Sequence, residues 1–282
     1  MDKTATHALK KMALHIRMDI IEGTFHAKSG HPGGSLSAAD MLAYLYFEEM
    51  NIDPKAPEKA DRDRFVLSKG HAAPALYSAL AHRGFFPVAD LKTLRKTDST
   101  LQGHPNMNFT PGVDMSTGSL GQGVSCAVGM ALSAKLSDAD YRVYTMLGDG
   151  ELQEGQVWEA AMFASFRKLD NLIAMIDNNN LQIDGSVDEI CSPYPIEEKF
   201  AAFGWHVLSI DGHDFDQMET AFREAKTIVG KPVAIVMRTV KGKGVSFMEN
   251  QCSWHGMAPG KEQFEEAMTE LSDKLEKMEV GA

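Results

Sequence analysis

Short apolar runs rich in β-branched and aromatic residues alternate with helix-like stretches along most of this chain. The runs predicted to be strands are Phe65–Leu67, Tyr141–Leu147, Leu172–Asp177, Trp205–Ile210 and Pro232–Val240. Helical spacing of apolar residues occurs from Leu9 to Ile20 and from Ala39 to Phe47, with Ser35 and Ser37 as candidate caps of the second helix. This alternation is typical of a mainly parallel sheet with helices on both faces. Because no repeat or linker interrupts it, the sequence predicts one α/β domain over residues 1–282.

The segment from Lys261 onward has a different pattern. Apolar residues step by four, three, four and three among charged neighbours, at Phe264, Met268, Leu271, Leu275 and Met278. This spacing predicts an amphipathic helix at about residues 261–279. Its apolar face either packs on its own domain or forms an interface, and the sequence leaves both open.

Composition excludes several classes of partner. The formal net charge is −11, so no broad basic surface is expected, and neither nucleic acid nor an anionic membrane is a predicted partner. The start of the chain does not have the pattern of a signal peptide, and no apolar run approaches the ~20 residues that span a bilayer. A cytoplasmic location is therefore expected. Cys126, Cys191 and Cys252 are far apart in sequence, which favours reduced thiols over a metal or redox site.

Oxygen-bearing side chains follow two of the predicted strands at the point where each strand ends. Gly148-Asp149-Gly150 follows the Tyr141–Leu147 run, and Asn178-Asn179-Asn180 follows the next one. A crossover helix between them makes the strands parallel neighbours, so both groups should meet at one edge of the sheet. Carboxylate, amide and carbonyl oxygens suit Mg²⁺, with Ca²⁺ or Mn²⁺ as alternatives, and an incomplete set of ligands indicates that a diphosphate supplies the rest. The competing interpretation is two ordinary turns.

Histidines beside glycines form a second candidate cluster. They are His31, His71, His104, His213 and His255. Four of them are predicted to line one site, where imidazoles could bind phosphate and move protons near neutral pH. His213, within Asp211-Gly212-His213-Asp214, is instead typical of a turn and helix start.

Gly121-Gln122-Gly123 precedes a helical pattern and needs to be distinguished from a dinucleotide fingerprint. The third fingerprint position is Cys126 rather than glycine or alanine, and the preceding Val113 to Leu120 is not a strand pattern. A nucleotide-binding function is therefore not predicted.

The stretch from Gly148 to Gly155 and its continuation from Asp177 to Gly185 closely resemble the thiamine diphosphate motif of transketolases. The other motifs of that family follow in order along almost the whole chain: Ser29-Gly30-His31-Pro32-Gly33-Gly34, Ser68-Lys69-Gly70-His71-Ala72, Gly103-His104-Pro105, Thr117–Gly123 and Trp254-His255-Gly256. Two departures are mild. Ser119 stands where the family commonly has proline, and Asn178 where it often has aspartate.

The resemblance implies a fold, a cofactor and a set of residues that bind it. The fold is the diphosphate-binding domain of thiamine enzymes. The implied metal ligands are Asp149, Asn179 and the carbonyl of Leu181. The implied contacts of the cofactor itself are His71 and Gly150 at the diphosphate and Gly118, Ser119 and Leu120 beside the aminopyrimidine.

Other residues are implied in catalysis and assembly. His31, His104 and His255 would line the substrate channel, with His255 also near the diphosphate. Glu154 and Glu159 match acidic residues at the subunit interface of the family, and Glu154 is expected to contribute to catalysis from there.

The expected function is transfer of a two-carbon ketol unit from a ketose phosphate to an aldose phosphate. Transketolases usually continue with a pyrimidine-binding domain, which this sequence lacks, so it resembles the N-terminal subunit of a split enzyme with two copies of each chain. Two alternatives stay open. One is a subunit of another split thiamine-dependent enzyme, either a synthase that acts on an unusual sugar or an enzyme that decarboxylates a 2-oxoacid. The histidines argue against the decarboxylating enzyme. The other is a noncatalytic regulator that binds metal and diphosphate.

Overall fold

A five-stranded parallel sheet lies at the centre of the computed structural model, which describes residues 1–280. Its strands are β1 (Arg64–Leu67), β2 (Val143–Gly148), β3 (Leu172–Asn178), β4 (His206–Asp211) and β5 (Val233–Arg238). Their order across the sheet is β1-β2-β3-β5-β4, and every neighbouring pair is parallel. All five predicted strands and the predicted parallel arrangement are thus confirmed. Gly148 pairs with Asp177, so β2 and β3 end at the same edge of the sheet.

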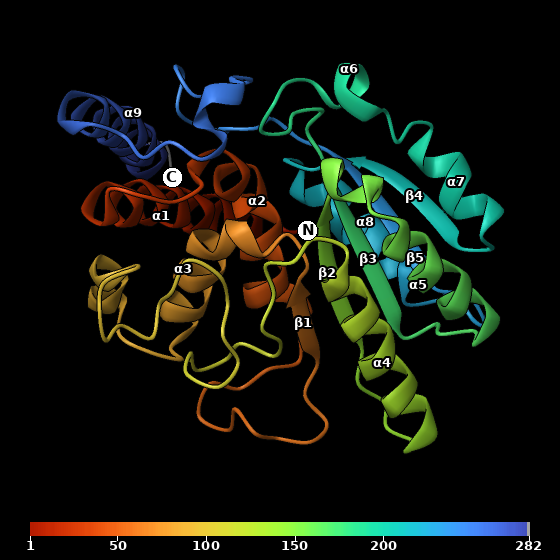
Figure 1. The fold of residues 1–282 in the computed structure, drawn as a ribbon. Coiled ribbons are helices and arrows are strands. Elements are labelled where there is room, and N and C mark those ends of the chain that lie inside the picture. The colour runs from red at the N-terminus through yellow and green to blue at the C-terminus, as the bar shows by residue number, and fades with distance from the viewer. Residues whose placement is uncertain (281–282) are drawn as a thin grey trace.

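Helices cover both faces of this sheet (Figure 1). One face carries α1 (Lys3–Ala27), α2 (Pro32–Tyr44), α3 (Ala73–Arg83), α8 (Phe215–Ala225) and α9 (Lys261–Val280). The other carries α4 (Gln122–Leu136), α5 (Gly155–Phe166) and α7 (Ile196–Ala202). Successive strand side chains point to opposite faces, so Tyr144 and Met146 enter the first core while Val143 and Leu147 enter the second.

Short elements join these layers. They are the π-helical turn η1 (Leu45–Glu49), the 3₁₀ turns η2 (Gly70–Ala72), η3 (Val88–Thr93), η4 (Gly150–Gln153) and η5 (Cys252–His255), and the short helix α6 (Val187–Cys191). Of these, η2 and η4 begin within three residues of the ends of β1 and β2 and thus lie at the edge of the sheet where those strands end.

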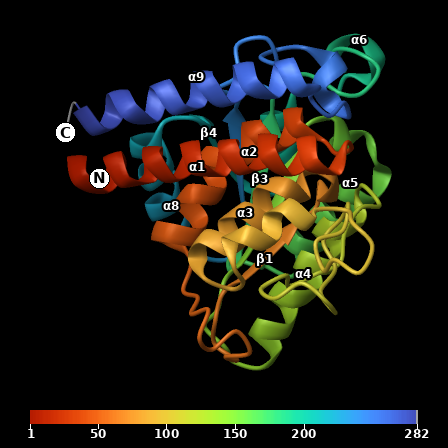
Figure 2. The same ribbon diagram turned by 90° about the vertical axis from the view of Figure 1, so that its left-hand side faces the viewer.

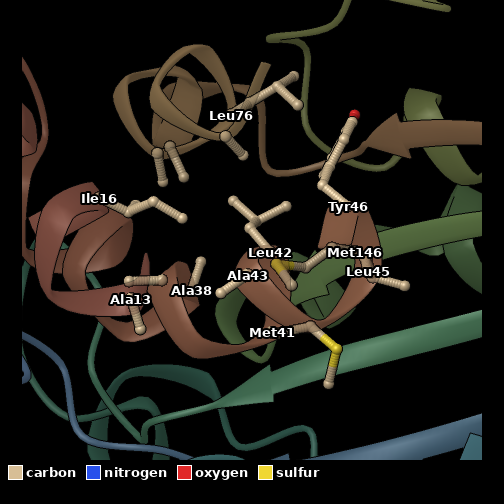
Figure 3. Packing of buried hydrophobic residues seen from close by; sticks show 14 of the residues in the cluster. Ala13, Ile16, Ala38, Met41, Leu42, Ala43, Leu45, Tyr46, Leu76 and Met146 are labelled. Carbon is tan, nitrogen blue, oxygen red and sulfur yellow. The ribbon is translucent and has the colours of Figure 1, made fainter. Parts of the chain in front are cut away.

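The helix α2 is buried along its whole length, and its predicted start was wrong. It begins at Pro32, not near Ala39, so Ser35 and Ser37 are interior residues whose hydroxyls donate to the carbonyls of His31 and Gly34. A helix that is buried on all sides has no one-sided apolar stripe, and a search for such a stripe therefore misses its first turns. Figure 3 shows Ala38, Met41 and Leu42 of this helix packed among side chains from neighbouring elements.

The helix α9 lies along α1 (Figure 2), and its predicted apolar stripe is confirmed. Phe264 stacks on Phe25 with ring centroids 4.2 Å apart, and Leu271 is fully buried. The apolar face of this helix therefore packs on its own chain. No helix in the described part of the chain is long and apolar enough to cross a membrane. The three cysteines form no disulfide.

Candidate functional site

A cavity of about 280 Å³ opens at the edge of the sheet where β1, β2 and β3 end. Most of the residues predicted for the site line it: His31, His71, Gly118, Leu120, Asp149, Gly150, Glu154, Asn179, Leu181 and His255. Two predicted residues, His104 and Ser119, do not. The fold thus brings together residues from segments that are more than 200 positions apart in sequence.

Asp149 is the acidic centre of the cavity and is only 2% exposed. Its carboxylate accepts hydrogen bonds from the backbone N–H groups of Gly150 and Asn180. Burial and the neighbouring charge of Asp177 nevertheless raise its pKa to about 6. Asn179 directly precedes Asn180, and its amide oxygen accepts from the N–H of Leu181 at 3.1 Å. This group of hard oxygen donors carries a negative charge that the protein only partly neutralises.

Two buried lysines that the sequence interpretation did not assign also line the cavity. Lys69 and Lys241 are each 2% exposed. The Lys69 ammonium donates to the carbonyl of Gly34 at 2.7 Å and forms an ion pair with Asp177. The Lys241 ammonium donates to the carbonyl of Leu181 at 2.7 Å and lies 2.8 Å from Nδ1 of His255. Burial and the charge of Lys69 lower the pKa of Lys241 to about 8.

A signal for these lysines was present in the sequence. Lys69 follows β1 by two residues and Lys241 follows β5 by three, and a glycine comes directly after each. Asp149 likewise follows β2 directly and precedes a glycine. A charged residue with this placement projects at the edge of a parallel sheet where ligands bind. The same criterion applied to all the strands would have found both.

Three histidine rings meet in the cavity. The ring centroids of His31 and His71 are 5.2 Å apart, those of His71 and His255 are 5.2 Å apart, and those of His31 and His255 are 5.6 Å apart. Burial and Lys241 lower the pKa of His255 to about 3, and burial and Lys69 hold the pKa of His71 well below its usual value. In the protein without a bound anion the rings of His71 and His255 are therefore neutral at pH 7, and proton transfer by these histidines stays a prediction. Neutral imidazoles present one hydrogen-bond donor and one acceptor each.

The fourth predicted histidine lies beside the cavity. Gly118, which lines it, adopts a φ of +138°, and a Cβ there would approach the ring of His104 to 2.8 Å. The close contact and the positive φ together explain why glycine occupies this position. His104 and Ser119 are both exposed. His104 thus reaches the cavity only at the edge formed by Gly118.

Glu151 was not predicted and holds the cavity wall in place. Its carboxylate is 2% exposed and accepts from the Ser68 hydroxyl at 2.5 Å and from the N–H groups of Gly121 and Gly148 at 2.9 and 3.1 Å. It thereby ties together the ends of β1 and β2 and the start of α4. The predicted Glu154 is the exposed residue directly before α5.

The charges of this cavity match two ligands of opposite sign. Lys69 and Lys241 place two ammonium groups beside a hollow, and a bound anion would reduce the repulsion between them. Asp149 would be stabilised by a cation in the same way. Within residues 1–280 no three His, Cys, Asp or Glu side chains come together as a metal site. The amide of Asn179 and the carbonyl of Leu181 add oxygen donors to Asp149 at this cavity, the donor type that Mg²⁺ takes.

Comparison with known proteins identifies relatives over most of the chain. Residues 8–280 match the family model described as "Transketolase, thiamine diphosphate binding domain". The chain is 52% identical to the 6-deoxy-6-sulfo-D-fructose transketolase subunit SqwG of Clostridium sp. (strain MSTE9), covering 86% of this chain and 88% of that protein. It is 44% identical to an apulose-4-phosphate transketolase subunit of Phocaeicola vulgatus, covering 93% of each.

Longer relatives share the same region. Human transketolase is 44% identical over 98% of this chain, which spans 44% of the human protein. The crystal structure of transketolase from Campylobacter jejuni superposes with a TM-score of 0.89 at 36% identity, covering 96% of this chain and 43% of that one. The chain thus spans less than half the length of these two proteins but nearly the whole length of the two named subunits.

Proposed function

The chain belongs to the transketolase family as a thiamine diphosphate-binding domain, and we propose that it is the N-terminal subunit of a two-chain transketolase. In this function it transfers a two-carbon ketol unit from a ketose phosphate to an aldose phosphate. The observation that carries the proposal is the placement of two buried ammonium groups and the buried Asp149 carboxylate around one cavity. That arrangement suits a diphosphate bridged to a divalent cation.

We assign the metal ligands to Asp149, the amide oxygen of Asn179 and the carbonyl of Leu181. Because the Lys241 ammonium now donates to that same carbonyl, Lys241 would have to turn away when Mg²⁺ binds. The diphosphate would then offer Lys241 a phosphate oxygen in exchange for the carbonyl. The bond from an ammonium to a phosphate oxygen is the stronger of the two, because both partners are charged.

The other predicted cofactor contacts are assigned to the two ends of the cofactor. His71, His255 and Gly150 would contact the diphosphate. Gly118, Ser119 and Leu120 would flank the aminopyrimidine, and Leu120 already offers an apolar surface that is 37% exposed. When bound, thiamine diphosphate supplies the nucleophilic carbon that carries the two-carbon unit between sugars.

The histidines of this chain are proposed to handle the sugar hydroxyls. The low pKa values of His31 and His255 keep both rings neutral, so each ring can donate a hydrogen bond to one sugar hydroxyl and accept one from another. His104 at the edge of the cavity would bind a hydroxyl farther along the sugar.

A second chain with a pyrimidine-binding domain is the proposed partner, in two copies of each. Support comes from the two relatives that are named subunits and match this chain in length. The helix α5 supports it too, since its side chains Met162, Phe163 and Phe166 are 60%, 43% and 77% exposed. Such an apolar face beside Glu154 and Glu159 suits a subunit interface, which would bring another chain close to the cavity.

A second class of sugar is also a candidate donor substrate. One relative is named for a sulfonated sugar and the other for a phosphorylated one, so both names describe a sugar that carries an anion. A sulfonated ketose is therefore a donor to test beside the ketose phosphates. Release of the shortened aldose from each donor in turn, with the partner present, distinguishes the two.

Calorimetric titration with Mg²⁺ and thiamine diphosphate tests the proposed site. Wild-type chain with its partner should bind both, and Asp149→Ala should abolish the metal-dependent part of the affinity because it removes the one carboxylate among the proposed ligands. Glu266→Ala, which replaces an exposed acidic residue of α9 outside the cavity, serves as the control for a lost charge. Unchanged affinity in Asp149→Ala would refute the metal assignment.

A further inference from the structure

The segment from Thr239 to Lys243, which follows β5, carries Lys241 into the cavity and is bonded to its surroundings on both sides of that residue. Thr239 donates its N–H to the carbonyl of Asn178 at 3.1 Å and its hydroxyl to Asp177. The N–H of Gly242 donates to the carbonyl of Gly33 at 3.0 Å. The carbonyl of Lys243 accepts from Nε of Arg17 at 2.9 Å. The backbone around Lys241 is therefore fixed.

The carbonyl of Lys241 itself accepts from the N–H of Asn250 at 2.9 Å, and the residue before Lys241 is held by a histidine outside the cavity. The N–H of Val240 donates to Nε2 of His213 at 2.9 Å. A nitrogen that accepts carries no proton, so the proton of this ring is on Nδ1. Nδ1 lies 2.6 Å from Oδ2 of Asp40 and donates to it. Two hydrogen bonds thus run in one direction, from the N–H of Val240 to His213 and from His213 to Asp40. They connect Asp40 to the residue directly before Lys241.

Asp40 is itself held firmly. It lies in α2, is 6% exposed, and forms an ion pair with Arg17 of α1. Burial alone would raise its pKa, but Arg17 and His213 outweigh burial and hold the pKa at about 2. The carboxylate is therefore charged over the whole working range of pH. It orients the imidazole in one tautomer, as a carboxylate does for a histidine that must accept at its far nitrogen.

Nothing in the contacts of His213 explains it as part of the hydrophobic core. Its side chain is 13% exposed, and both ring nitrogens are used. A turn and helix start need neither, because Asp214 alone caps α8 by accepting from the N–H groups of Asp216 and Gln217. The two bonds of the ring instead connect α2 to the segment that bears Lys241.

We propose that His213, oriented by Asp40, is a positioning residue that fixes Lys241 where its ammonium meets the cofactor diphosphate. This inference rests on the proposed function, from which it takes the identity of the bound ligand. It differs from that function in predicting that residues outside the cavity, in contact with no ligand, set the affinity for the diphosphate. His213 would act on cofactor binding and not on the chemical step.

Two variants of His213 and one matched control test the proposal. His213→Leu removes both bonds, while His213→Gln places an amide oxygen about where Nε2 lies and can still accept from Val240. The control is His82→Leu. His82 bonds to a carboxylate, Asp19, at 2.8 Å and is 20% exposed, but it lies in α3, away from the Lys241 segment. Both leucine variants lose one histidine–carboxylate bond, so a loss of stability alone affects both.

The first measurement uses the full chain without cofactor. Hydrogen exchange of the Val240 amide should accelerate about tenfold or more in His213→Leu, the factor that corresponds to the loss of one buried hydrogen bond. It should stay near the wild-type rate in His213→Gln and in His82→Leu. An unchanged rate in His213→Leu would overturn the proposal at its first step.

The second measurement is calorimetric binding of inorganic diphosphate with Mg²⁺, and of thiamine diphosphate with Mg²⁺, to the chain with its partner. Both affinities should fall about tenfold in His213→Leu, with recovery in His213→Gln and no change in His82→Leu. Turnover at saturating cofactor should equal that of the wild type, since His213 touches no reacting group.

The outcomes separate the inference from the function on which it rests. Wild-type chain that binds the cofactor, together with His213→Leu that binds it equally well, would refute the inference and leave the function standing. An equal loss of affinity in His82→Leu would also refute it, by tracing the effect to stability. A wild-type chain that binds no cofactor in the presence of its partner would refute both.

Discussion

Replacing Asp149 by asparagine should make the ligand-free protein more stable at neutral pH while removing its response to metal. The carboxylate is 2% exposed, and its pKa is raised from 3.8 to about 6, first by burial and then by Asp177. A shift of about 2 units means that ionised Asp149 costs the folded state about 3 kcal/mol at pH 7. An uncharged amide of the same shape avoids this cost.

The substitution also has a penalty. The two carboxylate oxygens accept from the N–H groups of Gly150 and Asn180, and an amide has only one oxygen to offer. One N–H then loses its partner, which costs about 1–2 kcal/mol. The net expectation is a gain of about 1–2 kcal/mol at pH 7, the difference between these two estimates.

The sign of the effect depends on pH. Because the folded-state pKa of Asp149 lies above the unfolded value, its contribution to stability is fully present below pH 3.8 and is lost as the pH rises through about 6. Asp149→Asn should therefore exceed the wild type in stability at pH 7 and lose that advantage toward pH 4. Urea unfolding with a chelator present, at several pH values, measures the difference.

Adding ligand should reverse the order of stability. Mg²⁺ and thiamine diphosphate at about 100 times the dissociation constant stabilise a protein that binds them by about 2.7 kcal/mol. Wild-type protein should gain this amount in the presence of its partner, and Asp149→Asn should gain little. A variant that is less stable than the wild type at pH 7 without ligand, or that gains as much from ligand, would contradict this expectation.

Further predictions concern the other charged and proton-transferring groups of the cavity. Asp177→Asn should destabilise the protein by about 3–5 kcal/mol, measured by urea unfolding, because it leaves the buried Lys69 ammonium without its counter-ion; a loss below about 1 kcal/mol would be typical of an exposed pair and would exclude this role. Lys241→Met should weaken diphosphate binding in calorimetry, and wild-type affinity should fall as the pH rises through about 8, where the ammonium loses its proton; a flat profile between pH 7 and 9 would argue against it. His104→Ala and His255→Ala should each lower turnover by about tenfold to ten-thousandfold, with cofactor affinity better preserved in His104→Ala; variants that lose the fold but keep full specific activity in their soluble fraction would mark these histidines as structural.

The sheet and most of the cavity could be predicted from local patterns. The five strands are short and rich in β-branched residues, and Asp149 and Asn179 directly follow two of them, so parallel pairing alone brings these two side chains together. The insertion of β5 between β3 and β4 could not be predicted, because the order of strands depends on how the helices pack and not on any one strand. The full burial of α2 was missed for the same reason.

The pKa values of the site could not be predicted, because they depend on distances between side chains that are far apart in sequence. Lys69 and Lys241 are 172 positions apart in sequence, yet each changes the pKa of nearby groups in one cavity. The low pKa values of His71 and His255 follow first from burial and then from these two lysines, and the motifs around the histidines show neither the burial nor the distances. The connection from Asp40 through His213 to Val240 likewise joins three elements and could be found only in the folded chain.

The chain is proposed to be the diphosphate-binding subunit of a transketolase and to need a second, pyrimidine-binding chain for activity. Ketol transfer by the purified chain, with saturating Mg²⁺ and thiamine diphosphate, should be measured before and after the candidate partner is added. We expect no transfer by the chain alone and activity once the partner is present, lost again in Asp149→Ala. Full activity of the single chain, or none with a partner that demonstrably binds it and the cofactor, would overturn the proposal.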